Sequence, residues 1–270
     1  MNRGAAAAKI NLALVVGPRR VDGKHEVATV YQRIALADRI EVRTAERTEV
    51  TGYRDDTLVA RALHELTSNE DVRLAAHIEK RIPVASGLGG GSADAAAALR
   101  LGNELLERPL DGARLEEIGA DLGADVPFFL LDGPRLGTGD GTELQPLDLP
   151  QDYWVVLVLP RGASKTSTAD VYARFDERDG ADGFVQRRAG LVDALRGVAR
   201  PRDLAELPPN DLASSALADE LRDLGAFRAD VSGAGPAVYG LFLHRAAATE
   251  AESRIARHGR TWLTAPAWYV

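Results

Sequence analysis

The stretch PVASGLGGGSADAAAALR, residues 83–100, places four glycines within five positions and then continues into alanines. Glycine weakens regular structure because it loses the most backbone entropy on folding, whereas alanine is the strongest helix former. A glycine-rich turn that enters a helix presents backbone N–H groups at the positive end of the helix dipole, where an anion such as phosphate binds. A plain strand-to-helix turn, the alternative, needs only one or two glycines. The stretch therefore predicts a phosphate-binding loop.

This stretch does not match the two most common phosphate-binding motifs. A Walker A loop requires a lysine directly after its last glycine, and no glycine here is followed by one. A dinucleotide-binding fingerprint that started at Gly87 would need glycine at its sixth position, which is Ser92. The predicted nucleotide site thus belongs to another class of fold.

The composition limits the partners and the location of the protein. The chain has 270 residues, 33 basic and 40 acidic, for a net charge of −7, which argues against binding to nucleic acid or to an anionic membrane. It has no cysteine, so thiolate catalysis, thiolate metal sites and disulfides are excluded. No apolar run approaches the roughly 18–20 residues that span a bilayer. The apolar N-terminal segment superficially resembles a signal peptide. However, Lys9 interrupts it and no small-residue cleavage site follows before Arg19–Arg20, so a cytoplasmic protein is expected.

Strand and helix patterns alternate along the chain, which predicts an α/β or α+β fold with mixed sheets packed against helices. The expected strands are 9–16, 32–45, 72–82, 152–160 and 235–243. The expected helices are 57–68, 92–107, 113–123 and segments near 168–175, 186–198 and 211–225, with Ser92 or Asp94 capping the helix at 92. A proline-bounded stretch at 147–150 predicts a domain boundary that divides the chain into residues 1–150 and 151–270.

Two charged residues stand in apolar surroundings. Lys9 lies inside AAAAKINLALVV, and a lysine in a buried strand is costly unless it is paired. Asp125 precedes Val-Pro-Phe-Phe, where it can simply cap a helix or can orient or deprotonate a hydroxyl group. Lys9 can reach solvent along its alkyl chain, or it can pair with Asp125 and a phosphate. Both alternatives remain open from the residues alone.

Taken together, these segments and several others resemble those of the GHMP kinases (galactose, homoserine, mevalonate and phosphomevalonate kinases and their relatives). The resemblance runs nearly end to end and rests on AKINLAL (8–14), GPRRVDGKHEV (17–27), KRIPVASGLGGGSADAA (80–96), LGADVPFFL (122–130), NDL (210–212) and SGAGPAVYGLF (232–242). The triple glycine is similar to the loop found in one branch of this family, whose members phosphorylate a cytidine diphosphate alcohol in the non-mevalonate isoprenoid pathway. The resemblance implies a two-domain α+β fold with the active site in the cleft between the domains.

The resemblance also implies which residues form the site. ATP and Mg²⁺ are the implied cofactors. The metal ligands stay unassigned, with Ser92 as a candidate on the magnesium side. Lys9 and Asp125 would be catalytic. The nucleotide would contact Lys80 and the loop residues Pro83, Val84, Ala85, Ser86, Gly87, Leu88, Gly89, Gly90, Gly91, Ser92 and Ala93. The small-molecule substrate would contact Asn11, Lys24, His25, Thr168 and Tyr172.

The chain departs from the family pattern at three places. Lys24 precedes His25 where the family has tyrosine, so one aromatic face of the cytosine site is lost, and its positive charge would instead favour a diphosphate. Asp56-Thr57-Leu58 replaces the family's Asp-Asn-Leu, and Ser92-Ala93 replaces a serine pair. A kinase for another small alcohol, and a nucleotide-binding protein without activity, are the alternative functions. The sequence does not predict an oligomeric state.

Overall fold

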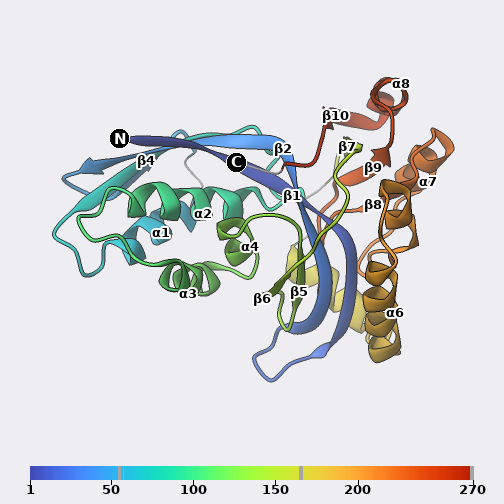
Figure 1. The fold of residues 1–270 in the computed structure, drawn as a ribbon, viewed down its shortest axis with the longest axis horizontal. Coiled ribbons are helices and arrows are strands. Elements are labelled where there is room, and N and C mark those ends of the chain that lie inside the picture. Colours follow the sequence, from blue (N-terminus) through green and yellow to red (C-terminus); the bar gives the residue numbers. More distant parts are fainter. Residues whose placement is uncertain (54–55, 57, 164–166, 268–270) are drawn as a thin grey trace.

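The computed structural model describes residues 1–53, 56, 58–163 and 167–267. Within these residues the chain forms two sheets, of six and four strands, with helices packed against both (Figure 1). The larger sheet has the order β3-β4-β2-β5-β6, and β1 also pairs with β2. Its strands are β1 (Asn2–Arg19), β2 (His25–Ala45), β3 (Glu49–Thr51), β4 (Arg73–Glu79), β5 (Arg135–Thr138) and β6 (Glu143–Pro146).

The second sheet has the order β10-β7-β9-β8 and is antiparallel throughout. Its strands are β7 (Trp154–Pro160), β8 (Arg228–Val231), β9 (Val238–Phe242) and β10 (Gly259–Thr264). The helices are α1 (Leu58–Leu66), α2 (Gly90–Asn103), α3 (Gly112–Leu122), α4 (Val126–Leu130), α5 (Thr168–Asp176), α6 (Phe184–Arg196), α7 (Ala216–Asp223) and α8 (Arg245–Ile255), with short 3₁₀ turns η1 (Pro201–Glu206) and η2 (Ala256–His258). The predicted α+β architecture is confirmed.

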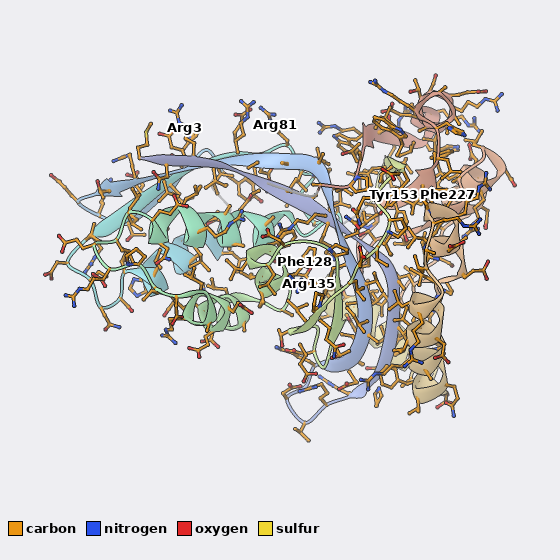
Figure 2. The ribbon with its side chains drawn as sticks, viewed as in Figure 1. Arg3, Arg81, Phe128, Arg135, Tyr153 and Phe227 are labelled. Carbon is orange, nitrogen blue, oxygen red and sulfur yellow. The ribbon has the colours of Figure 1, made fainter. Side chains whose placement is uncertain are left out.

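The helices α1 to α4 cover one face of the larger sheet (Figure 1). The opposite face carries charged side chains. Arg3 and Arg81 extend away from the helices on that open face (Figure 2). Arg3 pairs with Glu41 at 2.8 Å, and Arg81 pairs with Glu79 at 2.6 Å. This pattern, with polar residues outward and apolar residues inward, is typical of a half-solvated sheet; all its strand pairs are antiparallel except β3–β4. Within the described residues, no helix is both long and apolar enough to cross a bilayer.

The hairpin of β1 and β2 extends through both halves of the molecule. The first part of β1 packs against α2, whereas its second part shares a hydrophobic core with strands β7 and β9 and with α6. That shared core contains Ile10 and Leu12 from β1 together with Leu157 and Tyr239 from the second sheet. β1 is therefore buried without interruption from Ala6 to Gly17. The division at residue 150 stays a prediction, since one core joins side chains from both sides of it.

Two glycines on helices differ in the space around them, which gives a stability prediction. A Cβ on Gly102 of α2 would lie 2.8 Å from Leu66 Cδ2 and 2.9 Å from Leu74 Cδ1, both in the core, whereas a Cβ on Gly190 of α6 meets no atom within 4 Å. Overpacking costs about 1–3 kcal/mol, and removing an exposed helical glycine gains about 0.5–1 kcal/mol.

We therefore expect Gly102→Ala to lower the free energy of unfolding and Gly190→Ala to raise it. Denaturant titrations of the two variants beside the wild type measure both changes. A stabilising Gly102→Ala would show that the contact between α1, α2 and β4 is looser than the structure describes.

Candidate active site

The glycine stretch forms the loop between β4 and α2, as the sequence predicts, but the helix begins earlier than expected. α2 starts at Gly90 and its N-cap is Gly89, in the left-handed region at φ 71°. The prediction that Ser92 or Asp94 caps this helix is therefore wrong, because glycine adopts that φ without strain and ends the turn two residues sooner. The backbone N–H of Lys9 donates to Leu88 O at 2.9 Å, which fixes the loop on β1.

The second glycine segment, 232–235, packs directly against this loop. A Cβ on Gly235 would lie 2.2 Å from Gly87 N, and a Cβ on Gly87 would lie 2.1 Å from Ser232 O, so only glycines allow the two backbones to approach. Ser232 Oγ donates to Gly87 O at 3.0 Å. Asn210, from the NDL motif, donates from Nδ2 to Gly233 O at 2.7 Å and so holds the segment in place.

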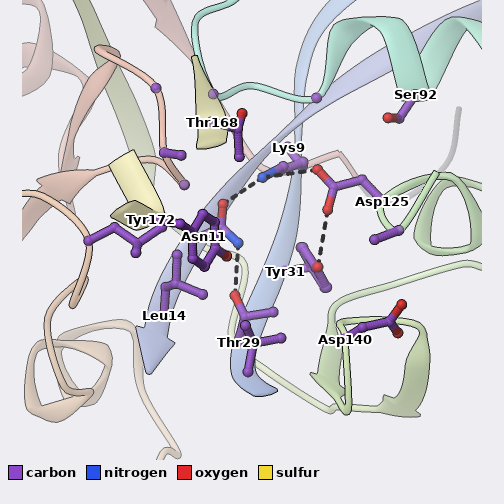
Figure 3. Close-up of a pocket in the computed structure, with 18 of the residues that line it drawn as sticks. Lys9, Asn11, Leu14, Thr29, Tyr31, Ser92, Asp125, Asp140, Thr168 and Tyr172 are labelled. Atoms are coloured by element: carbon purple, nitrogen blue, oxygen red, sulfur yellow. Dashed lines mark hydrogen bonds and ion pairs between the residues drawn. The ribbon is translucent and has the colours of Figure 1, made fainter. Parts of the chain in front are cut away.

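Lys9, Asn11 and Asp125 converge on one cavity, although they come from β1 and from the residue before α4 (Figure 3). Lys9 Nζ lies 3.4 Å from Asp125 Oδ2 and donates to Asn11 Oδ1 at 2.6 Å. The Lys9 side chain is 5% exposed, so the pairing predicted from its buried position is present and the solvent-exposed alternative is wrong. Asn11 Nδ2 donates to Thr29 Oγ1 at 2.8 Å, and Thr29 Oγ1 donates to Ala13 O, which fixes the orientation of the amide.

Two irregularities in the β1–β2 pairing flank these residues. The register shifts between Ala7 and Lys9 and again between Asn11 and Ala13. Such bulges redirect side chains and are frequent beside active sites. They lie on either side of the two polar residues that face the cavity, and a sequence pattern of apolar residues does not reveal them.

Tyr31 is a site residue that the sequence analysis missed. It lies opposite Asn11 on β2, and its hydroxyl donates to Asp125 Oδ1 at 3.1 Å. Burial, together with the nearby Asp125 carboxylate, raises the pKa of Tyr31 well above its usual value, so the hydroxyl keeps its proton. Its ring stacks on Phe128 of α4 with centroids 4.9 Å apart. Tyr31 stands beside Gln32 and Arg33 in the sequence, so no local contrast in polarity singled it out.

A buried arginine anchors the short helix that follows Asp125. Arg33, opposite Lys9 on β2, is 3% exposed and donates to the carbonyls of Phe128 and Leu131 at the end of α4. Burial lowers the pKa of Arg33 to about 10, which leaves it protonated near neutral pH. Cations at a helix C-terminus are favourable because they compensate the unpaired carbonyls. Arg33 therefore fixes α4, and with it the position of Asp125.

The loop separates two neighbouring cavities. The first, of about 400 Å³, holds the Lys9–Asp125 pair, and the second, of about 480 Å³, lies on the other side of the loop. Both are lined by Ala85, Gly87, Gly89, Ser92 and Thr168. A group bound at the loop can therefore be reached from both cavities.

Most of the residues predicted to bind the nucleotide line the second cavity. They are Lys80, Pro83, Val84, Ala85, Ser86, Gly87, Gly89, Gly90, Gly91 and Ser92. The other two predicted residues differ: the Leu88 and Ala93 side chains are 1% and 2% exposed and belong to the hydrophobic cores. Asp56 also lines this cavity and accepts from the backbone N–H groups of Val59 and Ala60 at the start of α1, whereas Thr57 lies outside the described residues.

The residues predicted to bind the substrate fall into two groups. Asn11, Thr168 and Tyr172 line the first cavity. His25 lies behind it: its Nε2 lies 2.8 Å from Asp176 Oδ1, and its ring packs on that of Tyr172 with centroids 4.7 Å apart. Burial raises the pKa of Tyr172 to about 12.

Lys24 also lies outside the first cavity. Its ammonium pairs at 2.5 Å with Asp140, a carboxylate that does line the cavity.

Comparison with known proteins identifies the class of protein to which this chain belongs. The family described as GHMP kinases N terminal domain matches residues 57–133, and GHMP kinases C terminal matches residues 206–261. A crystal structure of mevalonate kinase superposes with a TM-score of 0.77 at 12% identity, covering 98% of this chain and 99% of the other, so the fold is shared. Fold, loop and paired lysine and aspartate define a GHMP-type small-molecule kinase.

Relatives with higher sequence identity define the class of kinase more narrowly. A 4-diphosphocytidyl-2-C-methyl-D-erythritol kinase of Corynebacterium efficiens is 39% identical, covering 85% of this chain and 81% of that protein. One of Syntrophotalea carbinolica is 37% identical, covering 92% and 94%. A crystal structure of 4-(cytidine 5'-diphospho)-2C-methyl-D-erythritol kinase superposes with a TM-score of 0.79 at 31% identity over 98% of this chain and 99% of the other. The chain belongs to the 4-diphosphocytidyl-2-C-methyl-D-erythritol kinase family.

Two glycines of the loop provide a test of how closely a ligand approaches it. A Cβ on Gly89 would lie 2.8 Å from Phe129 and 3.0 Å from Lys9 Cγ at a positive φ, whereas a Cβ on Gly91 would make only an ordinary contact of 3.5 Å with Leu58. We expect Gly89→Ala to lower both stability and turnover, because it strains the backbone and displaces Lys9.

Gly91→Ala should leave the free energy of unfolding within about 0.5 kcal/mol of the wild type. It should weaken ATP binding, because Gly91 lines the second cavity and the added methyl group would take up space there. Calorimetric titration with ATP and thermal melts measure the two effects. Unchanged ATP affinity in Gly91→Ala would place the nucleotide away from this glycine.

Proposed function

We propose that this protein transfers the γ-phosphoryl group of ATP to the 2-hydroxyl of 4-(cytidine 5'-diphospho)-2-C-methyl-D-erythritol, a step of the non-mevalonate isoprenoid precursor pathway. The observation that carries the proposal is the buried pair of Lys9 and Asp125 in the first cavity, directly across the glycine loop from the second cavity. ATP would occupy the second cavity and the cytidine alcohol the first. A cytoplasmic location, a two-domain division at residue 150 and the absence of nucleic acid partners belong to the same proposal.

Phosphoryl transfer depends mainly on positioning and on placed positive charge, with little covalent chemistry by the protein. Asp125 would accept or orient the proton of the acceptor hydroxyl. Lys9 lies 3.4 Å from that carboxylate and would bring its charge to the transferred phosphoryl group. Tyr31 donates to the other carboxylate oxygen at 3.1 Å, so both oxygens of Asp125 are held in place and its negative charge is stabilised.

The loop would supply the phosphate contacts. Gly89 caps α2, so the first N–H groups of this 14-residue helix are free to donate to phosphate oxygens. Ser92 lines both cavities, and its hydroxyl would act where the two cavities meet.

Mg²⁺ fits this arrangement as an ion held mostly by the nucleotide. Within the described residues, no three His, Cys, Asp or Glu side chains gather as a metal cage. Mg²⁺ at phosphoryl-transfer sites is usually held by phosphates, water and one or two protein oxygens, and Ser92 would supply one. When bound, the ion would neutralise charge on the phosphates.

An assay of ADP release tests the function. We expect turnover with the cytidine diphosphate alcohol and none of comparable efficiency with homoserine, mevalonate or galactose. Efficient turnover of one of these instead would make the protein a GHMP kinase for another alcohol. ATP binding without turnover of any acceptor would support the alternative of a nucleotide-binding protein that has lost activity.

Variants of the central pair test the mechanism in the same assay. Lys9→Met and Asp125→Asn should each lower kcat by about a hundredfold or more, which is typical for the loss of one acid–base or electrostatic group. ATP binding to Asp125→Asn should stay close to wild type, since Asp125 faces the acceptor cavity. Near-normal kcat in either folded variant would remove that residue from the catalytic machinery.

The Lys24–Asp140 pair should affect the acceptor and not ATP. Burial raises the pKa of Asp140, but hydrogen bonds from Lys24 and Thr142 outweigh it and hold the pKa below its usual value, so the carboxylate is charged. Without Lys24 this charge would repel an anionic diphosphate.

We expect Lys24→Met to raise KM for the cytidine substrate up to about fivefold at low salt, because exposed pairs contribute up to ~1 kcal/mol. The double variant Lys24→Met/Asp140→Asn should return KM for the cytidine substrate to the wild-type value. Measurements of KM at low and high ionic strength check both. A double variant as impaired as Lys24→Met would exclude repulsion by Asp140.

A further inference from the structure

A buried cluster of three charged residues lies beneath the second cavity. Lys80, directly after β4, places Nζ 2.5 Å from Asp38 Oδ2 and 2.7 Å from Asp94 Oδ2. Asp38 comes from β2 and is 0% exposed, and Asp94 comes from α2 and is 1% exposed. The cluster therefore joins a central strand, the residue before the loop and the first turns of the loop helix.

Asp38 also holds the backbone that leads into the loop. Its Oδ1 accepts from the N–H groups of Arg81 and Ile82, at 2.5 and 2.8 Å. These two residues immediately precede Pro83, where the loop starts. One carboxylate thus fixes both the Lys80 ammonium and the start of the phosphate loop on the same strand.

Lys80 has one donor left for a ligand. An ammonium group carries three N–H donors, and the described residues accept two of them. Lys80 lines the second cavity, and its Nζ lies 5.8 Å from the ring centroid of Tyr53, which lines the same cavity. The remaining donor is therefore available on the side where a nucleotide would bind.

The charge of the cluster depends on Asp94. Two carboxylates and one ammonium would give a net negative charge beside a site for an anion. Among the residues that the structure describes, the buried Asp94 Oδ1 has no hydrogen-bond partner, and an ionised carboxylate is costly in such a place. Burial, opposed by Lys80 and assisted by Asp38, raises the pKa of Asp94 to about 8, so the cluster is neutral near pH 7.

We propose that Asp38 and Asp94 are positioning residues for ATP, which hold Lys80 against the nucleotide cavity and, with one proton on Asp94, remove the negative charge beneath it. The proposal rests on the assignment of the second cavity to ATP in the proposed function. Asp38 and Lys80 face the Asp94 carboxyl from β2 and from the end of β4, and Asp56 and Tyr53 line the same cavity.

Isosteric variants separate positioning from a structural role. We expect Asp38→Asn to raise the Kd for ATP about tenfold, measured by calorimetry without acceptor, and to leave KM for the acceptor within twofold. Glu79→Gln is the matched control: it removes a carboxylate one residue from Lys80 that pairs with Arg81 on the exposed face. It should leave the Kd for ATP unchanged.

The variant Asp94→Asn tests the role of the proton on the Asp94 carboxyl group, because an amide resembles the neutral carboxyl. In the wild type, the Kd for ATP should rise several-fold between pH 7 and pH 9 as Asp94 loses its proton. In Asp94→Asn the Kd at pH 7 should stay within twofold of wild type and should not rise with pH. This measurement also tests the proposal where Asp38→Asn fails to fold.

Several outcomes would overturn the proposal. They are an Asp38→Asn variant that folds and binds ATP normally, equal losses toward ATP and acceptor, or the same pH dependence in the wild type and Asp94→Asn. Failure of the cytidine alcohol as an acceptor would leave the ATP titrations valid. Absence of ATP binding to the wild type would instead refute the proposed function.

Discussion

The site depends on the contact between two glycine segments that are about 145 residues apart in the chain, as the hydrogen bond from Ser232 to Gly87 records. At Gly87 and Gly235 the backbones approach more closely than any Cβ allows. This contact closes the loop against the second sheet, while the bond from Lys9 to Leu88 closes it against the first. The N-terminal end of α2, where we propose that phosphate binds, is thereby fixed from two sides before any ligand arrives.

Much of the fold could be predicted from the sequence. Over a long segment, the spacing of apolar residues shows whether the segment is a strand, with a period of two, or a helix, with a period of about 3.6. The predicted strands around β1, β2, β4, β7 and β9 and the helices around α1, α2, α3, α5, α6 and α7 are all present. The short elements β3, β5, β6, β8 and α4 were missed, because three to five residues carry too little pattern. The longer α8 and β10, which follow residue 243, were missed as well. The start of α2 was misplaced because glycine, a poor helix former, occupies its first turn.

The candidate site was predictable where a residue conflicts with its surroundings. Lys9 and Asp125 are charges in apolar segments, and the structure places them together. Tyr31, Asp38 and Arg33 were missed because their partners come from distant segments: Asp125 for Tyr31, Lys80 for Asp38, and Phe128 for Arg33. Their importance follows from long-range contacts, which no local pattern records.

The long β1–β2 hairpin has a consequence for motion. Lys9, Asn11, Thr29 and Tyr31 all lie on these two paired strands, so their spacing does not change when the two sheets tilt relative to each other. Asp125 lies on a separate segment, and its 3.4 Å separation from Lys9 is longer than an ordinary hydrogen bond. Tyr31 and Arg33 of the same hairpin hold the Asp125 carboxylate and the end of α4, so a tilt of the two sheets would carry Asp125 along with Lys9. Only a movement of α4 itself would change the distance between the lysine and the carboxylate.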